Sequence, residues 1–299
     1  MKIPYYPGCT LKTTADYFET SAIASAKALG IEMVELPDWN CCGVVGSLTS
    51  DDLIRHLAPV RNMLRVEEMN ARGDIENENR LLTLCSMCYN TLQRTNARIK
   101  QSSEDLESIN NIMYLEEEPY KGTTEVVHFF QLLEEMGFDE LAKKIVKPLK
   151  GLKIAPYYGC MLLRPEELGI DKPDDPTIME NFVESLGADA VQWNARSICC
   201  GSYHTVSNKE IVVKLAYEIL HNARKCGADL LITSCPLCAF NLDNRQEEVE
   251  AQYLDFEPIP VLYFSQLLAL ALGLGVEATA FDKNYIDPRP ILKKKGLLK

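Results

Sequence analysis

The sequence contains two stretches in which a vicinal cysteine pair comes directly before a glycine. Each pair lies between a single cysteine that follows a glycine and a C-x-x-C motif. The two sets are Cys9, Cys41, Cys42, Cys85 and Cys88, and Cys160, Cys199, Cys200, Cys235 and Cys238. These sets use ten of the 11 cysteines in a chain without a secretion signal, which favours metal binding or redox chemistry over disulfides.

The number of thiols in each set restricts what they could hold. A structural zinc ion takes four ligands, and a regular four-iron cluster takes four cysteines. Five thiols fit neither count, so we predict an irregular iron–sulfur cluster with an extra thiolate in each set. Two alternatives stay open: a dithiol redox motif at C-x-x-C, and two zinc sites with the spare cysteines buried. Cys226 has no counterpart in the first set and is expected to be a small core residue.

The cysteine sets belong to a duplication that covers most of the chain. Six landmarks recur in the same order: PYYPGC and PYYGC, the Trp-Asn pairs, the CCG triplets, MNARG and HNARK, LLTLCSMC and LLITSCPLC, and VVHFFQLL and VLYFSQLL. They indicate two halves that join near residue 148. We therefore divide the chain into an N-terminal domain (1–148), a C-terminal domain (149–275) and an irregular basic tail (276–299).

Each half alternates short apolar, β-rich runs with helical stretches. This pattern predicts an α/β fold with two duplicated halves, each a parallel, Rossmann-like sheet with helices on both faces. The expected elements of the first half are strands at 2–7, 32–37 and 80–84, helices at 14–29, 50–69 and after Cys88, and a strand–helix pair at 125–136. The acidic insert 101–122 is expected to be a surface loop or a partner contact. Loops at the carboxyl ends of parallel strands meet at one edge, so the five thiols of each half can come together there.

The overall composition narrows the range of partners. A net charge of −12 repels nucleic acid and anionic membrane surfaces, so we expect neither as a partner. The longest apolar stretch, 261–276, is shorter than the ~20 residues of a membrane span and is interpreted as a strand and a core helix. The N-terminus lacks a signal-peptide pattern, and we expect a cytoplasmic protein. Flavin, NAD and regular relay clusters are expected on partner chains, because their motifs are missing from the sequence.

The repeated GC, CCG and C-x-x-C motifs resemble the cysteine-rich CCG-domain family over nearly the whole chain. Within that family, IPYYPGCTLK and DKNYIDPRP are similar to the B subunits of CoB–CoM heterodisulfide reductases. The resemblance implies a noncubane [4Fe-4S] cluster in each half, held by its five cysteines, and reduction of the mixed disulfide of coenzyme M and coenzyme B in methanogenesis. It also implies two partner chains, a ferredoxin-like C subunit and a flavin-containing A subunit, with a hydrogenase or formate dehydrogenase beyond them. The gap between Cys42 and Cys85 is a little longer than the family pattern.

Other members of the family use CCG domains differently, so further functions stay open. The runner-up is the iron–sulfur subunit of a glycolate or lactate oxidase, or of a thiol:fumarate reductase. A third possibility is a module that only transfers electrons. Turnover of a disulfide or of a 2-hydroxy acid would separate the two kinds of enzyme.

Four cationic side chains near the cysteines are candidates for binding the anionic groups of a coenzyme substrate: Lys12, Arg164, Arg196 and His204. Each could equally be a solvated surface charge. The duplication suggests that both sites face one cleft between the halves, where a disulfide would receive one electron from each site. We expect Lys12 and Arg164 on the walls of that cleft.

Overall fold

The computed structural model describes residues 1–44, 53–75 and 78–298. They form two parallel sheets with the same strand order, β2-β1-β3-β4 and β6-β5-β7-β8, which confirms the α/β fold with duplicated halves. The strands of the first sheet are β1 Lys2–Tyr6, β2 Glu32–Glu35, β3 Arg80–Thr83 and β4 Glu125–His128. Those of the second are β5 Lys153–Pro156, β6 Asp189–Ala190, β7 Leu230–Thr233 and β8 Val261–Tyr263.

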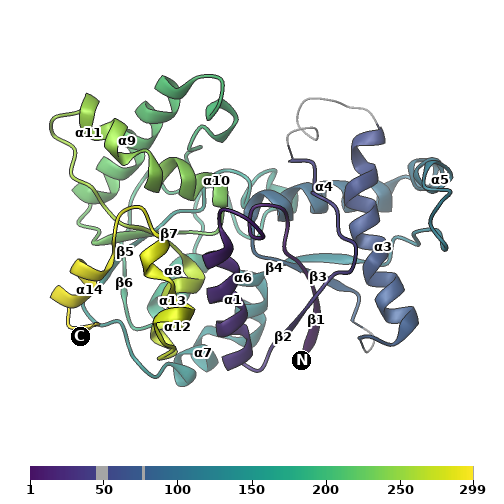
Figure 1. Ribbon diagram of the computed structural model, residues 1–299, viewed down its shortest axis with the longest axis horizontal. Helices are drawn as coiled ribbons and strands as arrows, with labels where there is room; N and C mark the ends of the chain where they lie inside the picture. Colours follow the sequence, from purple (N-terminus) through teal and green to yellow (C-terminus); the bar gives the residue numbers. More distant parts are fainter. Residues whose placement is uncertain (45–52, 76–77, 299) are drawn as a thin grey trace.

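Helices connect the strands in both halves. Those of the first half are α1 Asp16–Ala28, α3 Leu57–Arg72, α4 Ser86–Gln101, α5 Ser103–Ile112, α6 Phe129–Met136 and α7 Phe138–Lys144. Those that follow are α8 Ile178–Ser185, α9 Lys209–Lys225, α10 Pro236–Ala239, α11 Gln246–Gln252, α12 Phe264–Ala271, α13 Val276–Thr279 and α14 Arg289–Lys294. Figure 1 shows the two halves side by side, with α1 at their junction.

The repeated VVHFFQLL and VLYFSQLL segments fold in the same way. Each forms the last strand of its sheet and the helix that follows. The backbone N–H groups of His128 and Tyr263 donate to the side chains of Gln131 and Gln266, at 2.8 and 3.0 Å, and so cap α6 and α12. The predicted strand and core helix in 261–276 are therefore confirmed. No helix in the described part of the chain is long and apolar enough to cross a membrane.

The helix after the first C-x-x-C begins earlier than predicted. Cys85 is extended and is the N-cap residue of α4, which places Cys88 in the first turn instead of before the helix. The insert 101–122 also differs from the expected loop, because it contains α5. Ser102 caps this helix by accepting a hydrogen bond from the N–H of Asp105 at 3.1 Å.

The C-terminal segment is ordered and packed, and is not the irregular tail that the sequence suggested. It contains α13 and α14, and Leu292 is fully buried. The side-chain amide of Asn284 donates to the carbonyl of Val261 at 3.0 Å, which ties the segment to β8. The tail is therefore part of the second half.

Buried side chains pack the two halves together. Phe18 of α1 stacks on Tyr263 with 4.1 Å between ring centroids, and Phe130 of α6 packs on Phe264 of α12 at 4.4 Å. These residues lie at or just after the carboxyl ends of β4 and β8, or on α1 beside them. The junction is therefore continuous core, and it holds the carboxyl ends of both sheets close to each other.

Candidate metal centre

The strand ends bring the cysteines of each half together. Cys9 and Cys160 follow β1 and β5, and the vicinal pairs lie in the loops after β2 and β6. Cys85 and Cys235 follow β3 and β7 and are the N-cap residues of α4 and α10. Because all of these strands are parallel, their carboxyl ends face the same edge of each sheet.

The thiols lie in close pairs. Two sulfurs that bind one metal ion in a tetrahedron are about 3.7 Å apart, since each metal–sulfur bond is ~2.3 Å long. The measured Sγ–Sγ distances are 3.6 Å for Cys9 and Cys41, 3.5 Å for Cys42 and Cys88, and 3.4 Å for Cys200 and Cys238. The spacing of the thiols therefore suits shared metal atoms.

The two sets of cysteines also meet each other. The thiols of Cys85 in the first half and Cys235 in the second affect each other's pKa, which is lowered for Cys85 and raised for Cys235. Beside them, the hydroxyls of Ser86 and Ser234 are 2.7 Å apart, and the N–H of Ser86 donates to the carbonyl of Ser234 at 3.1 Å. The two sites are therefore neighbours across the junction.

Neighbouring thiols divide each set into cysteines that ionise more easily and cysteines that keep their proton. The pKa of Cys42 is lowered to about 4, first by its hydrogen bond with Cys41 and then by that with Cys88. The pKa of Cys199 is lowered to about 6, first by its hydrogen bond with Cys160, whereas the pKa values of Cys41 and Cys160 are raised. The thiolate is the form that binds metal, so each set holds at least one cysteine prepared for it.

Two tyrosines that the sequence analysis did not single out hold the vicinal-cysteine loops. The Tyr6 hydroxyl donates to the carbonyl of Asn40 at 2.8 Å, and the Tyr157 hydroxyl donates to that of Ile198 at 2.7 Å. Each carbonyl belongs to the residue directly before a cysteine pair. Burial raises the pKa of both tyrosines, so their hydroxyls keep the proton that they donate. The repeated PYY sequence was the signal for this pair.

The glycines before Cys9 and Cys160 leave room for sulfur. Gly8 and Gly159 have φ angles of +73° and +65°, which glycine adopts most easily. A Cβ atom at Gly8 would lie 3.0 Å from the sulfur of Cys88, and one at Gly159 would lie 3.2 Å from that of Cys238. A side chain at either position would push a thiol out of place.

The donor set suits a group with several metal atoms in each half. All repeated donors are sulfur, which binds iron–sulfur clusters and other soft metal centres. Across residues 1–44, 53–75 and 78–298, no three His, Cys, Asp or Glu side chains converge to hold a single metal ion. The thiols are instead distributed as pairs along the junction.

The candidate substrate cations differ in their surroundings. Lys12 pairs with Glu19 at 2.8 Å and Glu35 at 2.6 Å. Arg196 pairs with Asp175 at 2.8 Å and Glu180 at 2.9 Å. Carboxylates of their own halves therefore compensate both charges.

Arg164 and His204 are exposed on the second half, and a guanidinium nitrogen of Arg164 donates to the carbonyl of Ser197 at 3.3 Å. Another cation, Arg94 of α4, was missed by the sequence analysis. Burial raises the pKa of Tyr203 to about 12, and the charge of Arg94 acts in the opposite direction as a smaller effect. Arg94 therefore reaches from the first half toward the second cysteine loop.

Cys226 is exposed, and the expectation that it lies in the core is wrong.

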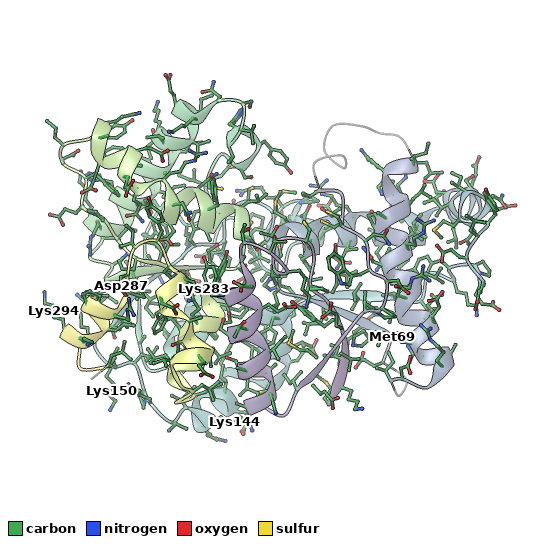
Figure 2. The ribbon with its side chains drawn as sticks, in the orientation of Figure 1. Met69, Lys144, Lys150, Lys283, Asp287 and Lys294 are labelled. Atoms are coloured by element: carbon green, nitrogen blue, oxygen red, sulfur yellow. The ribbon has the colours of Figure 1, made fainter. Side chains whose placement is uncertain are left out.

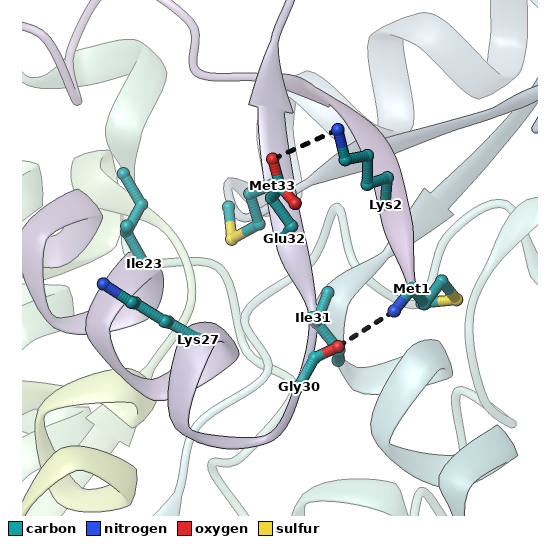
Figure 3. Close-up of a pocket in the computed structure, with 8 residues that line it drawn as sticks. All are labelled: Met1, Lys2, Ile23, Lys27, Gly30, Ile31, Glu32 and Met33. Carbon is teal, nitrogen blue, oxygen red and sulfur yellow. Dashed lines mark hydrogen bonds and ion pairs between the residues drawn. The ribbon is translucent and has the colours of Figure 1, made fainter. Parts of the chain in front are cut away.

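Two cavities differ in their distance from the thiols. The larger, of about 500 Å³, lies at the amino ends of β1 and β2, where Lys2 pairs with Glu32 (Figure 3). This end of the sheet is opposite to the cysteines. The other, of about 250 Å³, lies at the junction and is lined by Thr10 and Pro236, the residues that follow Cys9 and Cys235.

Comparison with known proteins decides the family. Residues 3–93 and 154–243 each match the CCG cysteine-rich domain. The chain is a member of this family. The two matches start and end at equivalent places in the halves, as the duplication predicted, and they contain all ten repeated cysteines.

Relatives align with nearly the whole chain. The 8-methylmenaquinol:fumarate reductase membrane anchor subunit of Wolinella succinogenes is 35% identical over 95% of this chain and 96% of its own. The B subunit of the ferredoxin/F(420)H(2)-dependent CoB-CoM heterodisulfide reductase of Methanosarcina acetivorans is 30% identical over 98% and 96%. A hypothetical protein from Helicobacter pylori shares the fold, with a TM-score of 0.75 at 14% identity. The match covers 95% of this chain and about half (51%) of that protein.

Proposed function

We propose that this chain is the redox subunit of a larger oxidoreductase and holds two iron–sulfur clusters, one in each half. The observation that carries the proposal is that the two five-cysteine sets meet beside the hydrogen bonds between Ser86 and Ser234, which adjoin Cys85 and Cys235. The ligands of the first cluster would be Cys9, Cys41, Cys42, Cys85 and Cys88, and those of the second Cys160, Cys199, Cys200, Cys235 and Cys238. When bound, clusters of this kind accept and release electrons one at a time.

The chain's own residues prepare both sites. Tyr6 and Tyr157 fix the loops of the vicinal pairs, and Gly8 and Gly159 let the C-x-x-C sulfurs approach the backbone. In the first half, the amino-terminal end of α4, with the positive pole of its helix dipole, favours negative charge next to Cys85. These features support thiolate-bound, anionic clusters, for which the sequence analysis proposed a noncubane [4Fe-4S] type.

The first candidate reaction is reduction of a disulfide, in particular the mixed disulfide of coenzymes M and B. Breaking a disulfide takes two electrons, and two adjacent one-electron sites would supply one each. The similarity to heterodisulfide reductase B subunits supports this candidate. Its partners would be a ferredoxin-like C subunit and a flavin-containing A subunit.

The second candidate is electron transfer from a quinol toward fumarate. It is supported by the 35% identity to the Wolinella protein, whose complex is named for these two substrates. It is also supported by the ion pairs of Lys12 and Arg196, which leave these two cations less suited to a polyanionic coenzyme. In this candidate the same two sites would pass electrons on to a partner chain.

Metal and sulfide analysis of anaerobically purified protein, with EPR, tests the proposal. About four irons with matching sulfide in each half are expected. Zinc in place of iron at both sites would overturn it, and iron in only one half would remove the two-site mechanism. Turnover with the heterodisulfide, compared with quinol-dependent reduction of the partner complex, then separates the two candidates.

A further inference from the structure

We propose that the 250 Å³ cavity at the junction binds the ring of a hydroquinone, next to both cysteine sites. The inference rests on the proposed function, because iron–sulfur clusters must receive the electrons, and it identifies the chemical class of the donor. The cavity is bounded by the loop after β1 with the start of α1, by α10 with the π-helical turn Phe240–Asn244, by the end of β8, and by the C-terminal segment. Segments from both halves are therefore needed to form it.

Aromatic side chains form much of the cavity wall. Tyr17 and Tyr263 are buried on its inner side, with 5.1 Å between their ring centroids. Phe240 and Tyr285 are 43% and 47% exposed and lie where the cavity opens to solvent. Aromatic walls bind flat rings by stacking and edge contacts. The shape and chemistry of this wall therefore fit a planar ring.

The charge of the cavity favours a neutral ligand. Lys283, labelled in Figure 2, is the one charged residue among the described residues that line it. It forms an ion pair with Asp16 of α1. A ligand with several negative charges would lack an uncompensated cation here. A hydroquinone needs only hydrogen-bond partners, which the cavity offers in the Tyr17 hydroxyl and the amide of Asn244.

The position of the cavity gives a bound ring access to both sites. Thr10 and Pro236 are the neighbours of a cysteine in each half. Tyr263 of the inner wall pairs with Thr233 of β7, two residues before Cys235. A hydroquinone bound here would become a quinone by losing two electrons and two protons. The clusters, when bound and oxidised, would accept one electron each, and both protons would leave to solvent through the open side.

The duplication does not produce this wall twice. The position equivalent to Tyr263 is His128 in the first half. Its Nε2 lies 2.8 Å from the carbonyl of Leu84, and the ring is fully buried. Tyr263, on the inner wall, therefore has no tyrosine counterpart in the first half.

Blocking the cavity from its rim tests the proposal. Thr14 is exposed and lines the cavity, so Thr14→Trp should fill it without disturbing the core. Thr20→Trp is the matched control, because Thr20 is exposed on α1 and its hydroxyl donates to the carbonyl of Asp16 in the same helix. The probe is menadione, whose affinity for the cluster-loaded protein is measured by calorimetry. Its reduced form, menadiol, is used to follow reduction of the clusters by absorbance.

We expect wild type and Thr20→Trp to bind menadione equally. Thr14→Trp should bind menadione at least tenfold more weakly, and menadiol should reduce its clusters at least tenfold more slowly. Equal binding by all three proteins, or no binding by wild type, would overturn the inference. Iron content and reduction by dithionite identify the source of a failure. If both are normal and menadione does not bind, only the quinol site is wrong, whereas protein without iron refutes the proposed function itself.

Discussion

Substitution of Gly8 by alanine tests the link between backbone shape and metal binding most directly. The added Cβ would lie 3.0 Å from the sulfur of Cys88 and 3.4 Å from the ring of Tyr6. Gly73→Ala is a matched control. Gly73 follows α3 with a φ angle of +76°, close to the +73° of Gly8, and a Cβ there would have no neighbour within 4 Å.

Both variants place a Cβ atom on a left-handed backbone, but only Gly8→Ala also brings that atom against the sulfur of Cys88. A Cβ in the left-handed region costs about 1–2 kcal/mol at either position. Non-bonded heavy atoms prefer a separation of about 3.5–4.0 Å, so Gly8→Ala must also move the Cys88 sulfur by about 0.5–1 Å. Metal–ligand distances tolerate changes of only about 0.2 Å. The displacement therefore exceeds what a cluster in the first half could accept.

The assay is iron and sulfide content after anaerobic purification, with urea unfolding of the metal-free proteins. Both variants should lose about 1–2 kcal/mol of unfolding free energy relative to wild type. Gly73→Ala should keep all of its iron, and Gly8→Ala should keep only that of the second half. Full iron in Gly8→Ala, with normal spectra, would refute the assignment of Cys88 as a ligand at this position.

Three further predictions follow from the same geometry. Cys42→Ser should lose the first cluster alone, whereas Cys85→Ser should perturb the EPR signals of both, because Cys85 adjoins the hydrogen bonds between Ser86 and Ser234 that join the two sites. Identical effects of the two changes would contradict this. Burial raises the pKa of Asp243 to about 7, above its value in the unfolded chain. The free energy of unfolding that this carboxyl contributes is therefore present below about pH 4 and is lost as the pH rises through 7. Asp243→Asn should therefore flatten the pH dependence of the urea midpoint in that range, and an unchanged slope would show that the carboxyl does not titrate there. Lys12→Gln should leave the affinity for an anionic disulfide within twofold, since Glu19 and Glu35 already compensate its charge, and a loss of tenfold or more would place Lys12 at the substrate.

The sequence was sufficient for the sheets and for the position of the cysteine-bearing loops at one edge of each sheet. Both depend on local patterns, the apolar strand runs and the loops that follow them, and parallel strands bring those loops to one edge. The meeting of Cys85 with Cys235 depends instead on packing across the junction, for example of Phe18 on Tyr263. No periodicity within either half encodes such contacts between distant segments.

The carboxylates that pair with the candidate cations could not be predicted from the sequence either. Lys12 is close to Cys9 along the chain, but the fold places two carboxylates beside it, and Arg196 is neutralised in the same way. Arg94 is far from the second cysteine set in sequence and lies beside it in space. Proximity along the chain is therefore a poor guide to substrate contacts when the site is built from two halves.

The contact between Cys85 and Cys235 also limits how independently the two sites can act. Each thiol changes the pKa of the other, so charge added at one site is felt at its neighbour. An electron placed on one cluster would then make the next electron harder to add beside it, because like charges repel strongly where water is excluded. A disulfide that takes one electron from each site relieves this repulsion, whereas a hydroquinone that gives one electron to each site works against it. The charge coupling at the junction therefore favours disulfide reduction over hydroquinone oxidation, unless a partner chain removes the first electron before the second arrives.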